Sequence, residues 1–265
     1  RLSPDGNRIA LTIQGTNDEI WTYDIPDQKF NRLTFEGRNS NPVWTPDGKR
    51  ITFRSDRGGT GTLNLFWMPA DGSGEAERLT KSEYNQSAQS WSSDGKSLIF
   101  SQIHPTTNAD LWILPRDSRQ KPHPVSNTRF VEMGGTFSPD GRWIAYTSNE
   151  SGRGEVYIRP FSGSGGVHQV SSDGGGSPIW ARSGELFYGS MDRMMAVDIQ
   201  TSPTLKIGTP RMLFNTRLES LMGFDVTRDG QRFLLIKSEE PEQTAAKVQI
   251  ILNWFEEIKK SMRKQ

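Results

Sequence analysis

The sequence repeats one pattern six times along its length. Each copy has an apolar residue, two small or turn-forming residues, Asp-Gly, and then a short apolar run. The fourth positions of the copies are residues 5, 47, 94, 140, 183 and 229, and the fifth copy has Ser183 in place of Asp. A unit of about 45 residues buries its apolar faces only by packing against its neighbours. The chain is therefore predicted to form an array of similar units.

Each copy contains several short strand-like segments. An apolar run follows the Asp-Gly turn, a second run rich in aromatic residues follows a polar turn, and a shorter polar run comes third. The first runs are 9–13, 51–53, 98–100, 144–146, 186–188 and 233–236; the second are 19–23, 65–68, 110–114, 155–158, 194–197 and 249–252; the third include 31–33, 77–79 and 168–170. With an inner strand before each turn, this predicts an all-β, six-bladed β-propeller of four-stranded antiparallel blades. We assign residues 1–257 to the propeller and 258–265 to a basic C-terminal tail, with almost no helix.

The repeated Asp-Gly pairs are interpreted as structural. Asp accepts hydrogen bonds from its own turn, Gly tolerates a positive φ, and Pro precedes Asp in three of the six copies. Turn chemistry alone explains these aspartates, so we do not assign them to calcium binding or catalysis. The repeated Trp and Tyr residues are expected to pack between blades.

The repeat also resembles known proteins. The segment 44–53, Trp-Thr-Pro-Asp-Gly-Lys-Arg-Ile-Thr-Phe, together with Arg78-Leu79-Thr80, is similar to the repeat of TolB-like six-bladed propellers. Segments 68–79, 104–107, 156–161, 194–198 and 252–257 resemble the C-terminal propeller of bacterial serine/threonine protein kinases. This second resemblance implies a sensing domain attached to a kinase. The fold is similar as well to the noncatalytic propeller of prolyl oligopeptidases.

The composition excludes several function classes. The chain has 32 basic and 31 acidic side chains, three histidines and no cysteine. The near-balance of charge argues against a nucleic-acid partner, which needs a broad basic field. The lack of cysteine excludes disulfides, thiol catalysis and cysteine-ligated metals. No apolar run has the length of a membrane-spanning helix, so we predict no direct membrane insertion.

Catalytic motifs are missing from the sequence. It contains no Gly-x-Ser-x-Gly in the strand-to-helix setting of a hydrolase, and neither His-Arg-Asp nor Asp-Phe-Gly of a kinase. The three histidines lie in or beside loops of different repeats without metal-ligand spacing. Carboxylates such as Glu256 and Glu257 are adjacent in sequence and do not resemble a glycosidase pair. We therefore predict no catalytic residue, no metal ligand and no cofactor.

The candidate site is the face formed by the loops that lead from one blade to the next. In a propeller these loops converge on the central channel. They are residues 35–41, 81–89, 127–135, 172–177 and 215–223. Their mixed charge and occasional aromatic residue suit a polypeptide or a small polar ligand. The candidate binding residues are Arg38, Asn41, Tyr84, Gln89, Arg129, Phe130, Glu132, Arg217 and Glu219.

Two classes of function remain open. The favoured one is a noncatalytic sensing or protein-interaction module, a monomeric domain of a longer bacterial signalling protein of the kinase type. The alternatives are a lactonase- or lyase-like enzyme at the central channel and a TolB-like periplasmic partner protein. The compartment is not determined; an upstream spanning helix or signal peptide would place the domain outside the cytoplasm.

The pattern also predicts how the ring closes. Only three residues precede the first Asp-Gly turn region, and no outer strand follows segment 248–254 in the last copy. We expect an upstream segment to supply the missing strand, and we expect segment 248–254 to be essential for the last blade.

Overall fold

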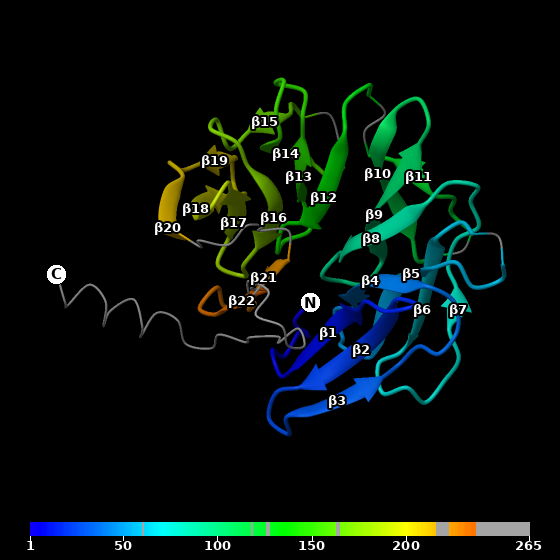
Figure 1. Ribbon diagram of the computed structural model, residues 1–265. Helices are drawn as coiled ribbons and strands as arrows, with labels where there is room; N and C mark the ends of the chain where they lie inside the picture. Colours follow the sequence, from blue (N-terminus) through cyan, green and yellow to red (C-terminus); the bar gives the residue numbers. More distant parts are fainter. Residues whose placement is uncertain (60, 118, 126–127, 163–164, 216–222, 237–265) are drawn as a thin grey trace.

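The computed structural model describes all of residues 1–265 except 60, 118, 126–127, 163–164, 216–222 and 237–265. Every regular secondary-structure element in this part of the chain is a β-strand, so the all-β prediction is confirmed there. Figure 1 shows small antiparallel sheets following one another around a common centre. In the same range no helix is long and apolar enough to cross a membrane.

The sheets follow the sequence repeats. The first three are β1 (Arg8–Ile13), β2 (Glu19–Asp24) and β3 (Lys29–Arg32); β4 (Asn39–Trp44), β5 (Arg50–Ser55), β6 (Asn64–Pro69) and β7 (Glu77–Arg78); and β8 (Gln86–Trp91), β9 (Ser97–His104), β10 (Asn108–Pro115) and β11 (His123–Pro124). The next two are β12 (Glu132–Phe137), β13 (Trp143–Ser148), β14 (Glu155–Pro160) and β15 (His168–Gln169); and β16 (Gly176–Trp180), β17 (Glu185–Ser190), β18 (Arg193–Gln200), β19 (Lys206–Ile207) and β20 (Arg211–Asn215). A final pair is β21 (Phe224–Val226) and β22 (Phe233–Leu235).

The number of blades differs from the prediction. Five sheets have three to five strands, whereas β21 and β22 form only a pair. The described part thus shows five blades, three of them four-stranded, rather than six. The strand expected at 249–252, the tail 258–265 and the short helical turns expected after Trp254 lie outside the described residues.

The Asp-Gly turns share one hydrogen-bonding pattern. The Thr45 hydroxyl donates to Asp47 Oδ1 at 2.6 Å and accepts from the Arg50 N–H at 3.0 Å. Asp47 Oδ1 also accepts from the Lys49 N–H at 3.0 Å, and Gly48 has a φ of 68°. The same hydroxyl–carboxylate pair recurs as Ser3–Asp5, Ser92–Asp94, Ser138–Asp140 and Thr227–Asp229. These aspartates are occupied by their own turns, which supports the structural interpretation.

The core lies between neighbouring sheets. Five clusters of buried apolar side chains each join one sheet to the next, the last joining β17 and β18 to β21 and β22. Phe53, Phe100 and Phe187 are fully buried in them, and burying a side chain of this size contributes about 1.5–3 kcal/mol. Trp91 stacks on Trp67 with ring centroids 6.0 Å apart. The predicted packing of aromatic residues between blades is observed.

The first and last described sheets meet through Asp225. Its Oδ2 accepts a hydrogen bond from the Leu2 N–H at 2.7 Å, and its Oδ1 lies 3.8 Å from the Arg1 guanidinium. Leu2 in turn forms a single antiparallel bridge with Ile9 of β1. These contacts connect β21 with the start of the chain and close the ring on that side.

Candidate functional site

A central channel of about 2030 Å³ lies inside the ring of sheets. Its wall is formed by the strands nearest the axis, β1, β4, β8, β12, β16 and β21, with contributions from their neighbours. Strands β4, β8, β12 and β16 each run from a loop between two sheets to an Asp-Gly turn or, in β16, its Ser-Gly equivalent. We call the end of the channel at these loops the loop mouth and the opposite end the turn mouth.

Four channel strands bulge near the loop mouth. The register shifts in β4, β8, β12 and β16 at equivalent positions. In β4, Asn41 and Pro42 stand where the partner strand has one residue. Asn41, Gly134 and Ser177 have φ values of 56°, 67° and 53°. A bulge releases backbone groups from the ladder and redirects side chains. Here the N–H groups of Asn41 and Ser177 donate instead to the hydroxyl groups of Thr12 and Thr147 in the neighbouring sheets, at 3.3 and 3.1 Å.

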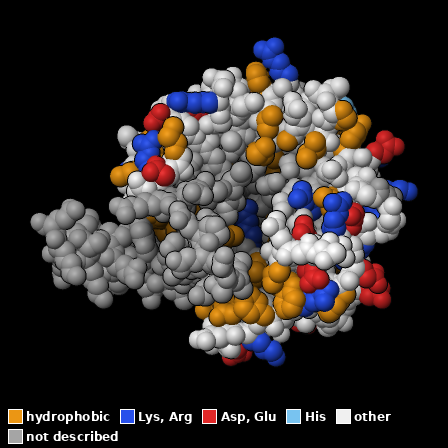
Figure 2. Space-filling view, in the orientation of Figure 1, with side chains coloured by type: hydrophobic (Ala, Val, Ile, Leu, Met, Phe, Trp, Pro, Cys, Tyr) orange, Lys and Arg blue, Asp and Glu red, His pale blue; other side chains and the backbone are white. Residues whose placement is uncertain are grey.

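Exposed apolar side chains surround the same mouth. Ile13 ends β1, Met133 lies at the start of β12, Met191 occupies the turn between β17 and β18, and Ile236 follows β22; all four line the channel. Their exposed fractions are 38%, 45%, 74% and 60%. Figure 2 shows hydrophobic side chains beside the central hollow. We call these four residues the apolar rim, and exposed apolar groups bordered by polar ones are typical of interaction sites.

Met191 adopts a backbone conformation that is unfavourable for its residue type. Ser190 pairs with Arg193, so Met191 and Asp192 form a two-residue hairpin turn. The φ of Met191 is 55°, and such a position favours Gly or Asn. An apolar residue that is both strained and exposed is not explained by packing. This position was missed from the sequence, although Met-Asp in a two-residue turn is a detectable departure from turn preferences.

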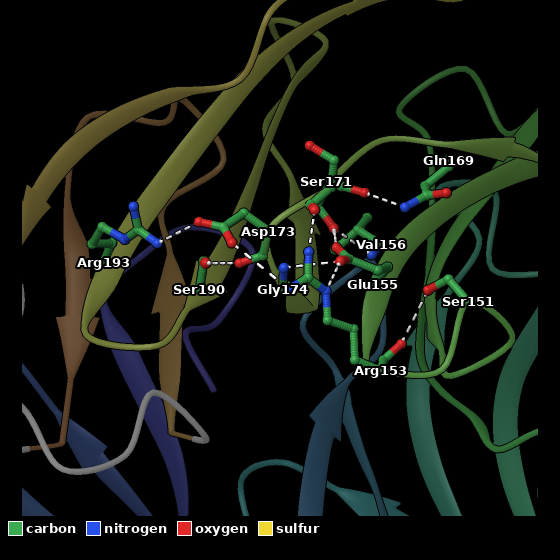
Figure 3. Close-up of polar contacts among 11 residues, drawn as sticks. Ser151, Arg153, Glu155, Val156, Gln169, Ser171, Asp173, Gly174, Ser190 and Arg193 are labelled. Atoms are coloured by element: carbon green, nitrogen blue, oxygen red, sulfur yellow. Dashed lines mark hydrogen bonds and ion pairs between the residues drawn. The ribbon is translucent and has the colours of Figure 1, made fainter.

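A polar cluster holds the loop before β16 beside the channel (Figure 3). Arg153 Nε donates to the buried Glu155 carboxylate at 2.7 Å, and the Gly174 N–H donates to the same carboxylate at 2.9 Å. The Ser171 hydroxyl donates to the other oxygen of Glu155. Asp173 accepts from Arg193 at 3.1 Å, which ties the loop to β18. The cluster positions a loop and leaves no carboxylate directed into the channel.

The predicted binding residues are only partly brought together. Asn41 and Gln89 line the channel. Asn41 Nδ2 donates to Ser87 Oγ at 2.8 Å, and Gln89 Nε2 donates to Ser101 Oγ at 3.1 Å. Arg38 lies outside the channel wall and pairs with Asp56 at 2.8 Å.

Four of the remaining predicted residues are described, and none of these four lines the channel. Tyr84 packs against His104 with ring centroids 4.6 Å apart, and the Arg129 guanidinium lies 5.2 Å from the Phe130 ring centre. Glu132 is buried and accepts a hydrogen bond from the Thr128 hydroxyl. Arg217 and Glu219 are outside the described residues. A binding role for these nine residues stays a prediction.

The channel wall carries little charge. Among the described residues that line it, the charged ones are Arg1, Arg182, Asp225 and Arg228. In the same part of the chain no three His, Asp or Glu side chains come close enough to hold a metal ion. Of the histidines, His104 contacts Tyr84, and His168 lies 6.2 Å from Trp143 between ring centres.

Comparison with known proteins identifies the class of fold. Residues 1–109 match the family model of the TolB beta propeller domain. The uncharacterized protein Atu1656 of Agrobacterium fabrum is 33% identical over 161 residues, which cover 54% of this chain and 52% of that protein. The Tol-Pal system protein TolB of Anaeromyxobacter dehalogenans is 34% identical over 89 residues, covering 33% and 20%. The uncharacterized peptidase YuxL of Bacillus subtilis is 36% identical over 107 residues, covering 37% and 16%.

A solved structure shows the same fold. TolB from Acinetobacter baumannii superposes with a TM-score of 0.71 at 20% identity, over 89% of this chain and 59% of that one. The chain therefore has a β-propeller fold, and its residues 1–109 are similar to the TolB beta propeller domain. It spans about half or less of the length of the curated relatives named above.

Proposed function

We propose that this propeller is a noncatalytic protein-interaction module that binds a polypeptide segment at the loop mouth. The apolar rim is the observation that carries the proposal. Methionine is enriched at protein interfaces, and its flexible chain adapts to different partners.

We also propose that the channel has no catalytic role. The described wall of the channel holds one carboxylate, Asp225, and that group bonds to Leu2 and Arg1. A lactonase- or lyase-like mechanism with an axial metal would need several oxygen ligands pointing into the channel. No specific observation favours that alternative.

The wider setting of the domain is also a proposal. One relative is named as a component of the Tol-Pal system, which supports a TolB-like partner protein outside the cytoplasm. None of the relatives described above carries the name of a kinase, so attachment to a kinase rests on the sequence resemblance alone. We further propose that β21 and β22 begin a sixth blade and that segment 248–254 completes it.

Substitution of Met191 gives a sharp test. Met191→Gly removes a rim side chain. It also relieves the strain of a positive φ at a non-glycine residue, which stabilises the fold by about 1–2 kcal/mol. The greater entropy of glycine in the unfolded chain offsets about 0.5–1 kcal/mol of this gain. The variant should be as stable as the parent or slightly more stable. Gln28→Gly is the matched control, because Gln28 has a φ of 53° in an exposed turn outside the channel wall.

The assay uses peptides selected from a random displayed library against the parent protein. We expect Met191→Gly to weaken the selected peptides about tenfold, since burying such a side chain contributes about 1.5–3 kcal/mol, and Gln28→Gly to leave them unchanged. Met133→Ser changes a second rim residue. If both Met191→Gly and Met133→Ser bind the selected peptides with the affinity of the parent protein, the rim is not the binding surface. Enrichment of no peptide would contradict the proposal as a whole.

A further inference from the structure

The turn mouth of the channel is ringed by one equivalent position from each repeat. This is the residue immediately before the Asp of the Asp-Gly turn, or before Ser183 in the fifth copy. All six side chains at this position line the channel: Pro4, Pro46, Ser93, Pro139, Arg182 and Arg228. Proline is the residue that prepares the entry to this turn. Repeats five and six replace it with arginine, which turn chemistry does not require.

The two arginines are held side by side. The Arg182 N–H donates to the Arg228 carbonyl at 2.7 Å, which joins the two turns. The Arg228 guanidinium donates to the Pro46 carbonyl at 3.1 Å and so reaches across the mouth to the second repeat. Within the described residues neither guanidinium forms an ion pair with a carboxylate. Asp5 is close enough to act on the charge of Arg228, but it forms no ion pair with it.

The arginine pair dominates the charge of the channel. Arg1 and Asp225, the other charged residues of the described wall, face each other at 3.8 Å and offset one another. Burial, and then the positive charge of Arg182, lower the pKa of Arg228, with Asp5 opposing the shift. Figure 2 shows basic side chains within the central hollow. Walls of low dielectric constant concentrate the field of such a pair in the channel.

We propose that Arg182 and Arg228 form an anion site at the turn mouth that binds carboxylate groups of an acidic polypeptide segment. Guanidinium groups bind carboxylates through two parallel hydrogen bonds, and their planar shape suits this geometry. The rest of the described wall is neutral, with groups such as Ser90 and Thr136. A peptide with a few acidic residues fits this wall better than a nucleic acid, which needs a broad basic surface.

This site is separate from the loop mouth and does not depend on the function proposed there. Isothermal titration calorimetry at low ionic strength tests it with blocked tetraglutamate, blocked tetraglutamine and inorganic phosphate. We expect tetraglutamate to bind, tetraglutamine to show no binding, and added salt to weaken the interaction. Phosphate should compete with tetraglutamate, because the two anions use the same guanidinium groups. Binding of phosphate but not of tetraglutamate would overturn the assignment to a polypeptide.

Variants locate the anion. Arg182→Gln removes an exposed guanidinium and should weaken tetraglutamate at least tenfold. Arg142→Gln is the matched control, because Arg142 lies at the fourth Asp-Gly turn, pairs with Asp140 and does not line the channel. Met191→Gly at the opposite mouth should also leave this binding unchanged.

A gain of charge keeps the test independent of losses in folding. Ser93→Arg adds a third guanidinium to the ring at an exposed position, so it should tighten tetraglutamate binding severalfold. Arg228→Gln also breaks the hydrogen bond to the Pro46 carbonyl. Its affinity for tetraglutamate is therefore interpreted together with its melting temperature. Parental affinity in both Arg182→Gln and Ser93→Arg, or an equal loss in Arg142→Gln, would overturn the proposal.

Discussion

Gly141 allows a direct measurement of what the Asp-Gly turns require. Its φ is 70°, and a Cβ built there meets no atom within 4 Å. An added Cβ therefore collides with nothing outside the turn, and we assign the cost of a substitution to the backbone conformation. A non-glycine residue in the left-handed region costs about 1–2 kcal/mol, and a β-branched residue lies at the upper end of that range or above it.

The expected effect can be resolved by equilibrium unfolding in urea. Gly141→Val should lower the free energy of unfolding by more than about 1 kcal/mol, a shift of about 2 °C or more in melting temperature for a chain of this size. Gly141→Asn should cost much less, because Asn tolerates this region. Gly15→Ala is the control, since Gly15 is not in the left-handed region and its added Cβ meets only Asn17 at 3.6 Å. An unchanged midpoint in Gly141→Val, or an equal loss in Gly15→Ala, would refute the reasoning.

Two further predictions concern hydrogen bonds of the blades. Thr52→Val removes the acceptor of the buried Trp91 indole N–H, now 3.0 Å from Thr52 Oγ1, and should cost about 1–3 kcal/mol in urea unfolding; a loss below the error of the measurement would contradict it. The Thr45 hydroxyl, followed by the Lys49 N–H, lowers the pKa of Asp47 below 3.8. The carboxylate of Asp47 therefore stabilises the fold fully above that pH and loses this contribution as pH falls through the lowered folded pKa. The acid unfolding profile should consequently be less steep in Asp47→Asn than in the parent. Superimposable profiles would contradict this prediction.

The strands were predictable because each repeat carries the same local signals. A turn of this type followed by an apolar run places the starts of β5, β9, β13 and β17 within one residue of those observed. The ends of β5, β13 and β17 lie two residues beyond the predicted runs, and β9 extends four residues beyond its run. The turn residues act through bonds to atoms at most five positions away, as Thr45 and Asp47 do. Structure decided at that range can be recognised in the sequence alone.

The pairing of strands that depends on residues far apart in the sequence could not be predicted from local signals. Strand β18 pairs with β17 along one side and with both β19 and β20 along the other. Which of these short polar strands takes the edge depends on the neighbouring sheet rather than on local propensity. The apolar rim was missed for the same reason, because Ile13, Met133, Met191 and Ile236 come together only through the ring.

The constant positions of the repeat serve the fold, so recognition should be sought where a copy departs from the pattern. The fifth copy shows how such a departure is accommodated. Ala181 replaces the turn hydroxyl and is fully buried, and Ser183 replaces the Asp. The turn keeps the backbone bond that all the other copies have, here from the Gly184 N–H to the Ala181 carbonyl at 3.1 Å. Because this shared backbone bond closes the turn, the fifth copy tolerates the loss of the side-chain bonds, and Arg182 lines the channel as Arg228 does. The same reasoning applies to Met191, where a strained turn retains an exposed apolar side chain at the opposite mouth.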